Sequence, residues 1–125
     1  MTSPTQSALA VMQAHIDALN AHDEPGIAAT LHFPQFRLNG IALKTWATPD
    51  SYFEDFRTRA GANWARSQFD DIRVILASED KVHLDAEINR FDGAGRIIST
   101  FRSLWVITLE NGRWAAKFRS SFATD

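Results

Sequence analysis

The chain has 125 residues, which suits one domain (residues 1–125) with a single hydrophobic core. Its 13 basic and 15 acidic residues give a net charge of −2 without blocks of either sign, which argues against a nucleic-acid binder and an electrostatic membrane surface. Cysteine is absent, so disulfides, thiol nucleophiles and thiolate metal sites are excluded. No basic segment precedes an apolar run near the N-terminus, and no stretch reaches the ~18 apolar residues of a membrane span. We therefore expect a cytoplasmic protein without membrane association.

Two helices are predicted first. Ser3-Pro4-Thr5-Gln6 is a capping box with proline at the first helical position, and apolar residues then recur at helical spacing. They are Leu9, Met12, Ile16 and Leu19, with Ala8, Val11 and His15 beside them. Asp23 is a good N-cap for a second, short helix carrying Ile27 and Leu31. We expect that helix to end at Phe33-Pro34, because the residue before a proline disfavours the α conformation.

A short hairpin and a third helix follow. Residues 35–43 are predicted to form a hairpin that turns at Asn39-Gly40, a strong turn dipeptide. Thr48-Pro49 then begins a helix, and Gly61 is expected just after its end. The apolar stripe of this helix consists of Tyr52, Phe53 and Phe56.

The second half of the chain is predicted to be antiparallel sheet. Four strands are expected at residues 64–77, 81–91, 96–110 and 113–123, joined by short turns that include Asn111-Gly112. Two-residue turns would place Trp105 opposite Phe118, Leu109 opposite Trp114 and Phe101 opposite Phe122 on one apolar face. The other face would carry mixed charges together with Leu104 and Val106, a composition that favours contact with a partner.

This order resembles a known superfamily. The stretch "ALNAHDEPGIAATLHFPQFRLNG" (residues 18–40) contains Asn20, Ala21, Asp23 and Ile27 in the pattern that joins the first two helices of the nuclear transport factor 2-like superfamily, in its ketosteroid isomerase and SnoaL-like polyketide cyclase branch. The ending "LENGRWAAKFRSSF" is similar to the last hairpin of many SnoaL-like proteins. The resemblance implies an α+β fold with three N-terminal helices packed on a strongly curved antiparallel or mixed sheet, the cystatin-like cone. It also implies a pocket and a homodimer formed through the outer sheet face.

The isomerase residues do not carry over. In an ungapped match the general-base aspartate of ketosteroid isomerases falls on Asn39, and their helix-one tyrosine falls on His15. Their second oxyanion donor falls near Leu104 or Trp105. Asparagine has no titratable carboxylate, so ketosteroid isomerase chemistry is not expected. Members of the superfamily also include cyclases, dehydratases, epoxide hydrolases and proteins without known activity, so function must be argued from the site.

His15 and Arg37 are the polar residues whose roles the sequence leaves open. His15 titrates near neutrality and could act as an acid or base, but a half-buried helix histidine with a local partner is the more common case. Gln35, Arg37 and Asn39 share one face of a strand, and Phe36 and Leu38 share the other. If the polar face points inward, Arg37 could clamp a carboxylate or phosphate. We expect the apolar face to point inward instead, which would leave Arg37 at the surface.

The other histidines have structural explanations. His32 is expected in the last turn of the second helix, where it would stabilise the helix dipole, and His22 is expected in an exposed turn. His83, Asp85 and Glu87 occupy every second position of one strand, so they share a face. Histidine and carboxylates are ligand types of metal sites. Ion pairs across the strands, with Arg102 opposite Asp85, explain that pattern equally well, and we expect neither metal nor cofactor.

The aromatic residues predict a pocket for a mostly apolar small molecule. A cone closed by helices leaves a concave apolar space, and small polar residues among large rings mark where it would lie. The expected lining is Trp46, Tyr52, Phe56, Phe101, Ser103, Trp105, Phe118 and Ser120, with His15, Arg37 and Asn39 as candidate catalytic residues. Ligand binding is one hypothesis. A cofactor-independent isomerase, cyclase or dehydratase using His15 is the second, and a non-catalytic dimerisation module is the third.

Overall fold

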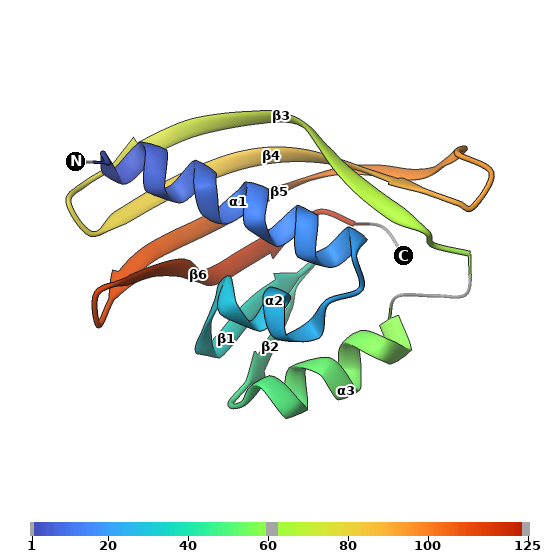
Figure 1. The fold of residues 1–125 in the computed structure, drawn as a ribbon, viewed down its shortest axis with the longest axis horizontal. Helices are drawn as coiled ribbons and strands as arrows, with labels where there is room; N and C mark the ends of the chain where they lie inside the picture. The colour runs from blue at the N-terminus through green and yellow to red at the C-terminus, as the bar shows by residue number, and fades with distance from the viewer. Residues whose placement is uncertain (1, 60–62, 124–125) are drawn as a thin grey trace.

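The computed structural model describes residues 2–59 and 63–123. These residues form three helices and six strands, and Figure 1 shows their arrangement. They are α1 (Pro4–Asn20), α2 (Glu24–Ala29), β1 (Leu31–Asn39), β2 (Ala42–Trp46), α3 (Pro49–Arg59), β3 (Arg66–Ala77), β4 (Lys81–Phe91), β5 (Ile97–Glu110) and β6 (Arg113–Ser121). Gly61, expected just after the third helix, lies outside the described residues. No helix in the described ranges is long and apolar enough to cross a membrane.

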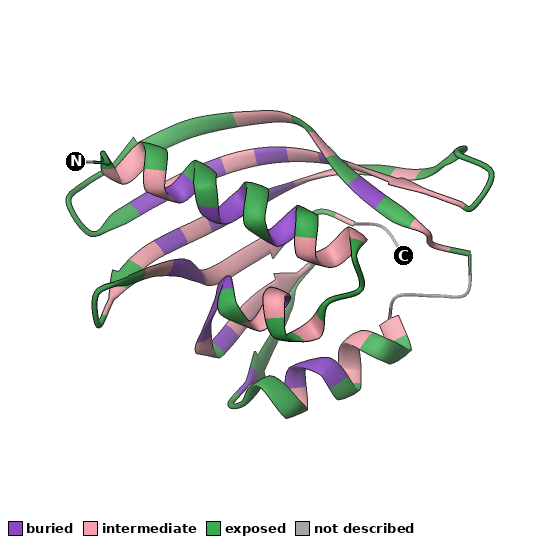
Figure 2. Ribbon diagram, viewed as in Figure 1, coloured by how far each residue is buried: buried purple, intermediate pink, exposed green. Residues whose placement is uncertain are grey.

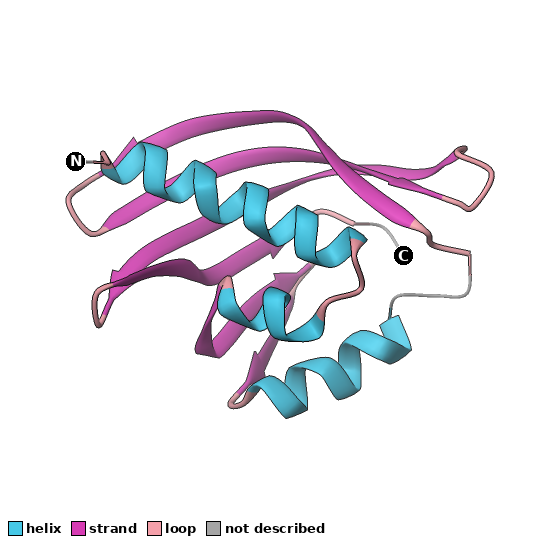
Figure 3. Ribbon diagram, in the orientation of Figure 1, coloured by secondary structure: helices cyan, strands magenta, loops and turns pink. Residues whose placement is uncertain are grey.

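The strands form one strongly curved mixed sheet in the order β2-β1-β6-β5-β4-β3 (Figure 3). Strands β3, β4, β5 and β6 pair in chain order, each antiparallel to the next, and β1 and β2 form an antiparallel hairpin. Strand β1 pairs with β6 in the parallel direction, which joins the hairpin to the rest of the sheet. The sheet stays open, with β2 and β3 as its edges. The predicted α+β architecture and the four C-terminal strands are confirmed.

Helix α1 lies along the concave face of the sheet and contacts β3, β4, β5 and β6 (Figure 1). The predicted capping box begins it: the backbone N–H of Gln6 donates to the Ser3 hydroxyl over 3.1 Å, and the backbone N–H of Ser3 donates to the Gln6 side chain over 3.0 Å. At the other end the Asn20 side chain exchanges two 2.8 Å hydrogen bonds with the backbone of Ser67. The Asn20 motif noted in the sequence therefore fixes the end of α1 to β3.

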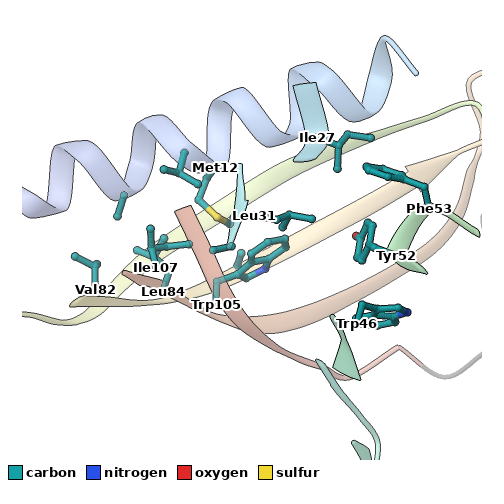
Figure 4. Packing of buried hydrophobic residues seen from close by; sticks show 14 residues of the cluster. Met12, Ile27, Leu31, Trp46, Tyr52, Phe53, Val82, Leu84, Trp105 and Ile107 are labelled. Carbon is teal, nitrogen blue, oxygen red and sulfur yellow. The ribbon is translucent and has the colours of Figure 1, made fainter. Parts of the chain in front are cut away.

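The core lies between α1 and the inner face of the sheet (Figure 2). Alternate residues of β4 and β5, such as Leu84 and Ile107, pack against Met12. Trp46, Tyr52 and Phe53 form the aromatic end of the same core, at α3, and Trp105 lies between this end and Met12 (Figure 4). Burial of these side chains is the main driving force for folding, at roughly 1.5–3 kcal/mol for each large apolar side chain.

The predicted end of the second helix is wrong. Helix α2 ends at Ala29, and the hydroxyl of Thr30, its C-cap residue, donates to the Ile27 carbonyl over 2.7 Å. Strand β1 begins at once because it pairs with β6: the Ala116 N–H donates to the Thr30 carbonyl over 2.8 Å. The Phe33-Pro34 bond, which is cis, therefore lies inside β1 and does not end a helix.

A β-bulge in β6 changes the predicted register. Leu109 pairs with Trp114 as expected, next to a type I′ turn in which Asn111 and Gly112 both have positive φ angles. Lys117 is then an extra residue, because Ile107 pairs with Ala116 and Val106 pairs with Phe118. Beyond the bulge every side chain of β6 points to the face opposite to the predicted one.

Trp105 consequently pairs with Arg119, and the predicted pairing of Trp105 with Phe118 is wrong. Phe122 donates its N–H to the Arg102 carbonyl over 3.1 Å, so it does not lie opposite Phe101 either. Phe118 shares a face with Val106. That face is the outer one, away from the helices.

Candidate functional site

A cavity of about 260 Å³, partly open to solvent, lies at the end of the sheet nearest α3. It is bounded by α1, α3 and the inner faces of β1, β3, β4, β5 and β6. One part of its wall is aromatic and consists of Tyr52, Phe56, Trp64 and Phe101. The polar lining comes from His15, Asn39, Ser67 and Ser121 and from four arginines.

The arginines are Arg37, Arg59, Arg90 and Arg119. No aspartate or glutamate lines this cavity in the part of the chain that the structure describes. The molecule as a whole is slightly acidic, so positive charge is concentrated here. A cavity with this lining attracts anions.

Two of the arginines are direct neighbours on parallel strands. Arg37 of β1 pairs in register with Arg119 of β6, and Asn39 pairs with Ser121 one row further on. All four line the cavity, so the polar face of β1 points inward and the expected inward orientation of Phe36 and Leu38 is wrong. The rule that apolar side chains point inward fails because the cavity, and not the packed core, lies beneath this part of β1.

Arg37 and Arg59 lie against the same indole ring. Their Cζ atoms are 5.6 Å and 5.4 Å from the ring centroid of Trp46. Arg59 has a counter-ion, since its Nε lies 3.2 Å from a carboxylate oxygen of Asp55. Burial lowers the pKa of Arg37, and the nearby charge of Arg59 lowers it further. The hydroxyl of Tyr52 accepts a hydrogen bond from Arg37 and raises this pKa.

Arg119 lies over the face of Trp105, with its Cζ 4.8 Å from the ring centroid. Its Nε is buried and has no hydrogen-bond partner in the described part of the chain. The indole N–H of Trp105 donates to the Ser103 hydroxyl over 2.8 Å, so Ser103 is occupied and does not reach the cavity. The tryptophan thus contacts a guanidinium whose Nε–H has no acceptor within the described residues.

His15 is buried in the middle of the inner face of α1, and its ring contacts Trp105 edge-on at 5.2 Å between centroids. Its Nδ1 lies 2.8 Å from the Thr30 hydroxyl. Because that hydroxyl gives its single proton to the Ile27 carbonyl, His15 must donate through Nδ1–H. The Nε2 of the neutral ring therefore carries a lone pair. Burial, with a smaller contribution from the charge of Arg37, lowers the pKa of His15 to about 4.

The predicted site residues fall into three groups. Tyr52, Phe56 and Phe101 line the cavity together with the candidate catalytic residues His15, Arg37 and Asn39. Trp46, Trp105 and Ser103 are outside the cavity lining: the two tryptophans contact the arginines, and Ser103 accepts a hydrogen bond from Trp105. Phe118 and Ser120 were expected in the pocket, but the bulge turns them to the outer face, where Ser120 pairs with Leu104. Asn39 is the last residue of β1, because Gly40 and Ile41 form the turn.

Three of the four arginines were not among the predicted site residues. Arg59 follows Tyr52 and Phe56 at helical spacing, and Arg90 continues the inward alternation of β4 after Ile88. These two positions could have been found from periodicity. Arg119 could not, because its orientation depends on the bulge.

The remaining charged groups form structural contacts. His32 lies in β1, where its Nε2 donates to the Thr108 carbonyl over 2.9 Å and its Nδ1 accepts from Arg113 over 3.3 Å, so the expected helix-dipole role is wrong. On the outer face Arg102 bridges the carboxylates of Asp85 (2.8 Å), Asp71 (3.3 Å) and Glu87 (3.5 Å). The ion-pair reading of this strand is thus confirmed, although Glu87, and not Asp85, pairs with Arg102 in register. No group of His, Asp and Glu side chains that could hold a metal occurs in the described ranges.

Comparison with known proteins identifies the fold. No protein-family model matches the chain, and no curated protein matches it. Among solved structures, a cystatin-like protein of unknown function from Nostoc punctiforme is similar with a TM-score of 0.78 and 10% identity over 97% of this chain and 93% of its own. A nuclear transport factor 2-like protein of unknown function from Shewanella oneidensis gives a TM-score of 0.78 and 10% identity over 94% and 98%.

A ketosteroid isomerase-like protein from Erwinia carotovora gives a TM-score of 0.68 and 16% identity over 94% of this chain and 95% of its own. Such similarities at low identity establish the fold alone. The resemblance inferred from the Asn20 motif is confirmed at that level: the chain has the cystatin-like fold of nuclear transport factor 2-like proteins.

Proposed function

We propose that the protein binds a small, largely apolar organic molecule in the cavity between α1, α3 and the sheet. The proposal rests on the cavity itself. At about 260 Å³ it exceeds the cavity of about 150 Å³ that holds a benzene molecule. Its wall combines an aromatic part with convergent polar groups, and both kinds of group occur together in small-molecule sites.

A titration with two probes tests this function. 2-Naphthamide and 2-naphthoate share a bicyclic ring and differ in charge, and Trp64 in the cavity wall provides a fluorescence signal. At least one probe should bind, and Ser121→Phe, which fills the cavity from β6, should weaken that binding about tenfold or more. Ser120→Phe is the matched control, because the neighbouring side chain points to the outer face. Failure of both probes to bind, or equal effects of the two variants, would contradict the proposal.

Proton transfer is a second candidate function, favoured by the fixed orientation of His15. Thr30 holds the ring in place through Nδ1–H, so Nε2 carries the lone pair and is the basic nitrogen. A pKa near 4 makes the group a weak base, and no carboxylate in the described cavity lining would assist it. Binding is therefore the function that the geometry supports better. If His15→Gln abolishes turnover of a substrate but leaves probe binding unchanged, the catalytic function becomes the better description.

We also propose that two copies associate through the outer sheet face. Leu104 on that face is 39% exposed and pairs with Ser120. It lies beside the carboxylates that are ion-paired with Arg102. Val106 and Phe118, which pair with each other, lie on the same face as Leu104, and a contiguous apolar patch of this kind favours coverage by another surface. The cytoplasmic location expected from the sequence stays a prediction.

A further inference from the structure

The cavity contains more positive charge than the protein neutralises. Arg59 is paired with Asp55, and Arg90 has partners that include the Ser99 hydroxyl at 3.5 Å. Arg37 and Arg119, by contrast, form no ion pair with a carboxylate anywhere in residues 2–59 and 63–123. Both side chains are half-buried, and a cation that is partly withdrawn from water without a counter-ion costs free energy, so its retention calls for an explanation.

The positions of these two residues make the cost larger. Arg37 and Arg119 are in register on hydrogen-bonded parallel strands, whose backbones lie about 4.8 Å apart. Like charges on directly opposite residues of neighbouring strands repel each other. Their contacts with Trp46 and Trp105 hold the two guanidinium groups on the cavity wall, and the Nε of Arg119 lacks a partner. The pair is therefore arranged as an anion site that the protein leaves open.

We infer that the ligand is an aromatic or otherwise apolar carboxylic acid, bound as its carboxylate between Arg37 and Arg119. This inference rests on the proposed function and names its ligand class. The planar fork of a guanidinium pairs bidentately with a planar carboxylate. Tyr52, Phe56 and Phe101 in the same cavity supply the surface for the apolar body of the ligand.

The neighbouring polar groups fit the same ligand class. Asn39 and Ser121, one row beyond the arginine pair, are hydrogen-bonding groups without charge, so they do not compete with the carboxylate for the guanidinium groups. His15 is neutral, and its Nε2 accepts a hydrogen bond from a hydroxyl or N–H group on the ligand. The site thus recognises one negative charge at one end of an otherwise uncharged molecule.

Comparison of the two naphthalene probes tests the inference. Calorimetric titration of the full chain should give a Kd for 2-naphthoate about 10- to 100-fold lower than for 2-naphthamide, since hydrogen bonds to charged groups are the stronger ones. Arg119→Met and Arg37→Met should each reduce this preference strongly, and Arg119→Lys should retain part of it. Arg73→Met is the matched control: it removes the same charge from an exposed side chain of β3 and should leave the preference intact.

The possible results separate the two proposals. Equal Kd values for both probes, or a preference that survives both arginine substitutions, would overturn the carboxylate inference and leave the small-molecule function standing. An equal loss of preference in Arg73→Met would trace the effect to overall charge and would also overturn it. Failure of both probes to bind would remove the proposed function together with the inference. Circular dichroism of each variant verifies that it folds.

Discussion

Arg37 and Arg119 occupy paired positions on adjacent parallel strands, and both guanidinium groups line the same cavity. Their separation in the sequence is large, and the parallel pairing of β1 with β6 brings them together. Neither arginine is ion-paired to a carboxylate within the described residues. This pair gives the cavity its chemical character and motivates the first of four predictions.

Removal of Arg119 should not destabilise the ligand-free protein. Arg119 is half-buried and its Nε has no partner, and replacement of such a charge by an apolar side chain of similar length is often neutral or stabilising. Arg119→Met should therefore leave the free energy of unfolding unchanged or raise it by about 1 kcal/mol. Arg102→Met on the outer face should lower it instead, because three carboxylates would lose their shared partner. Urea denaturation of both variants measures the difference. A large loss of stability in Arg119→Met would indicate that the cation is structural.

The stability of the protein should fall in mild acid because of His15. Its pKa in the folded state is about 4, below the value of 6.5 for an unfolded chain, so the unfolded state binds more protons between these pH values. Stability from this group is present above pH 6.5 and is lost as the pH falls towards 4. Between pH 7 and pH 5 the loss should be about 2 kcal/mol.

Substitution of His15 tests that assignment. His15→Gln should remove most of this pH dependence in urea unfolding, whereas His22→Gln, at an exposed turn position, should preserve it. NMR titration provides a direct measurement: the His15 ring signals should stay those of a neutral imidazole at pH 5. A midpoint near 6.5 would contradict the burial argument.

Gln35 should be a strong determinant of stability. Its amide group is buried and donates to the carbonyls of His32 (2.9 Å) in the same strand and of Ala116 (2.8 Å) in β6, and the second bond joins β1 to β6 near the start of their parallel pairing. Gln35→Leu would leave both carbonyls without this donor and should lower the free energy of unfolding by about 2 kcal/mol. Gln13→Leu on the exposed side of α1 is the control and should change it by less than about 0.5 kcal/mol. Similar midpoints of thermal unfolding for the two variants would refute this role.

Leu104 should control self-association. A charged side chain at the centre of an apolar contact is costly to bury, so Leu104→Glu should shift a dimer towards the monomer. Size-exclusion chromatography with light scattering at micromolar concentration measures the change, and Leu43→Glu on the edge strand β2 serves as the control. A wild-type protein that is already monomeric would refute the proposed interface.

Local signals explain why much of the fold was predictable. The capping box at Ser3, the N-cap at Asp23 and the type I′ turn at Asn111-Gly112 each determine their structure within a few residues, and the structure contains all three. The start of β1 was missed because it depends on a distant strand. Leu31 pairs with Ala116, and the local sequence near residue 31 does not indicate that contact.

The candidate site was less predictable for the same physical reason. His15, Tyr52 and Phe56 could be identified from helical periodicity, which needs only local sequence. The inward direction of Arg37 depends on where the packed core gives way to the cavity, and the direction of Arg119 depends on the bulge at Lys117. Both are properties of the assembled sheet, in which alternation of side chains is interrupted without a clear local signal.

The bulge at Lys117 makes the chemistry of the cavity depend on the register between β5 and β6. If β6 continued past Ala116 without a bulge, Val106 would lie opposite Lys117 and the two faces beyond it would be exchanged. Phe118 and Ser120 would then face the helices, and Arg119 and Ser121 would face outward. Removal of Lys117, by contrast, would abolish the bulge and keep Val106 opposite Phe118 and Trp105 opposite Arg119. In this scaffold, the polarity of the cavity wall is therefore determined by strand register as well as by the residue types in the strand.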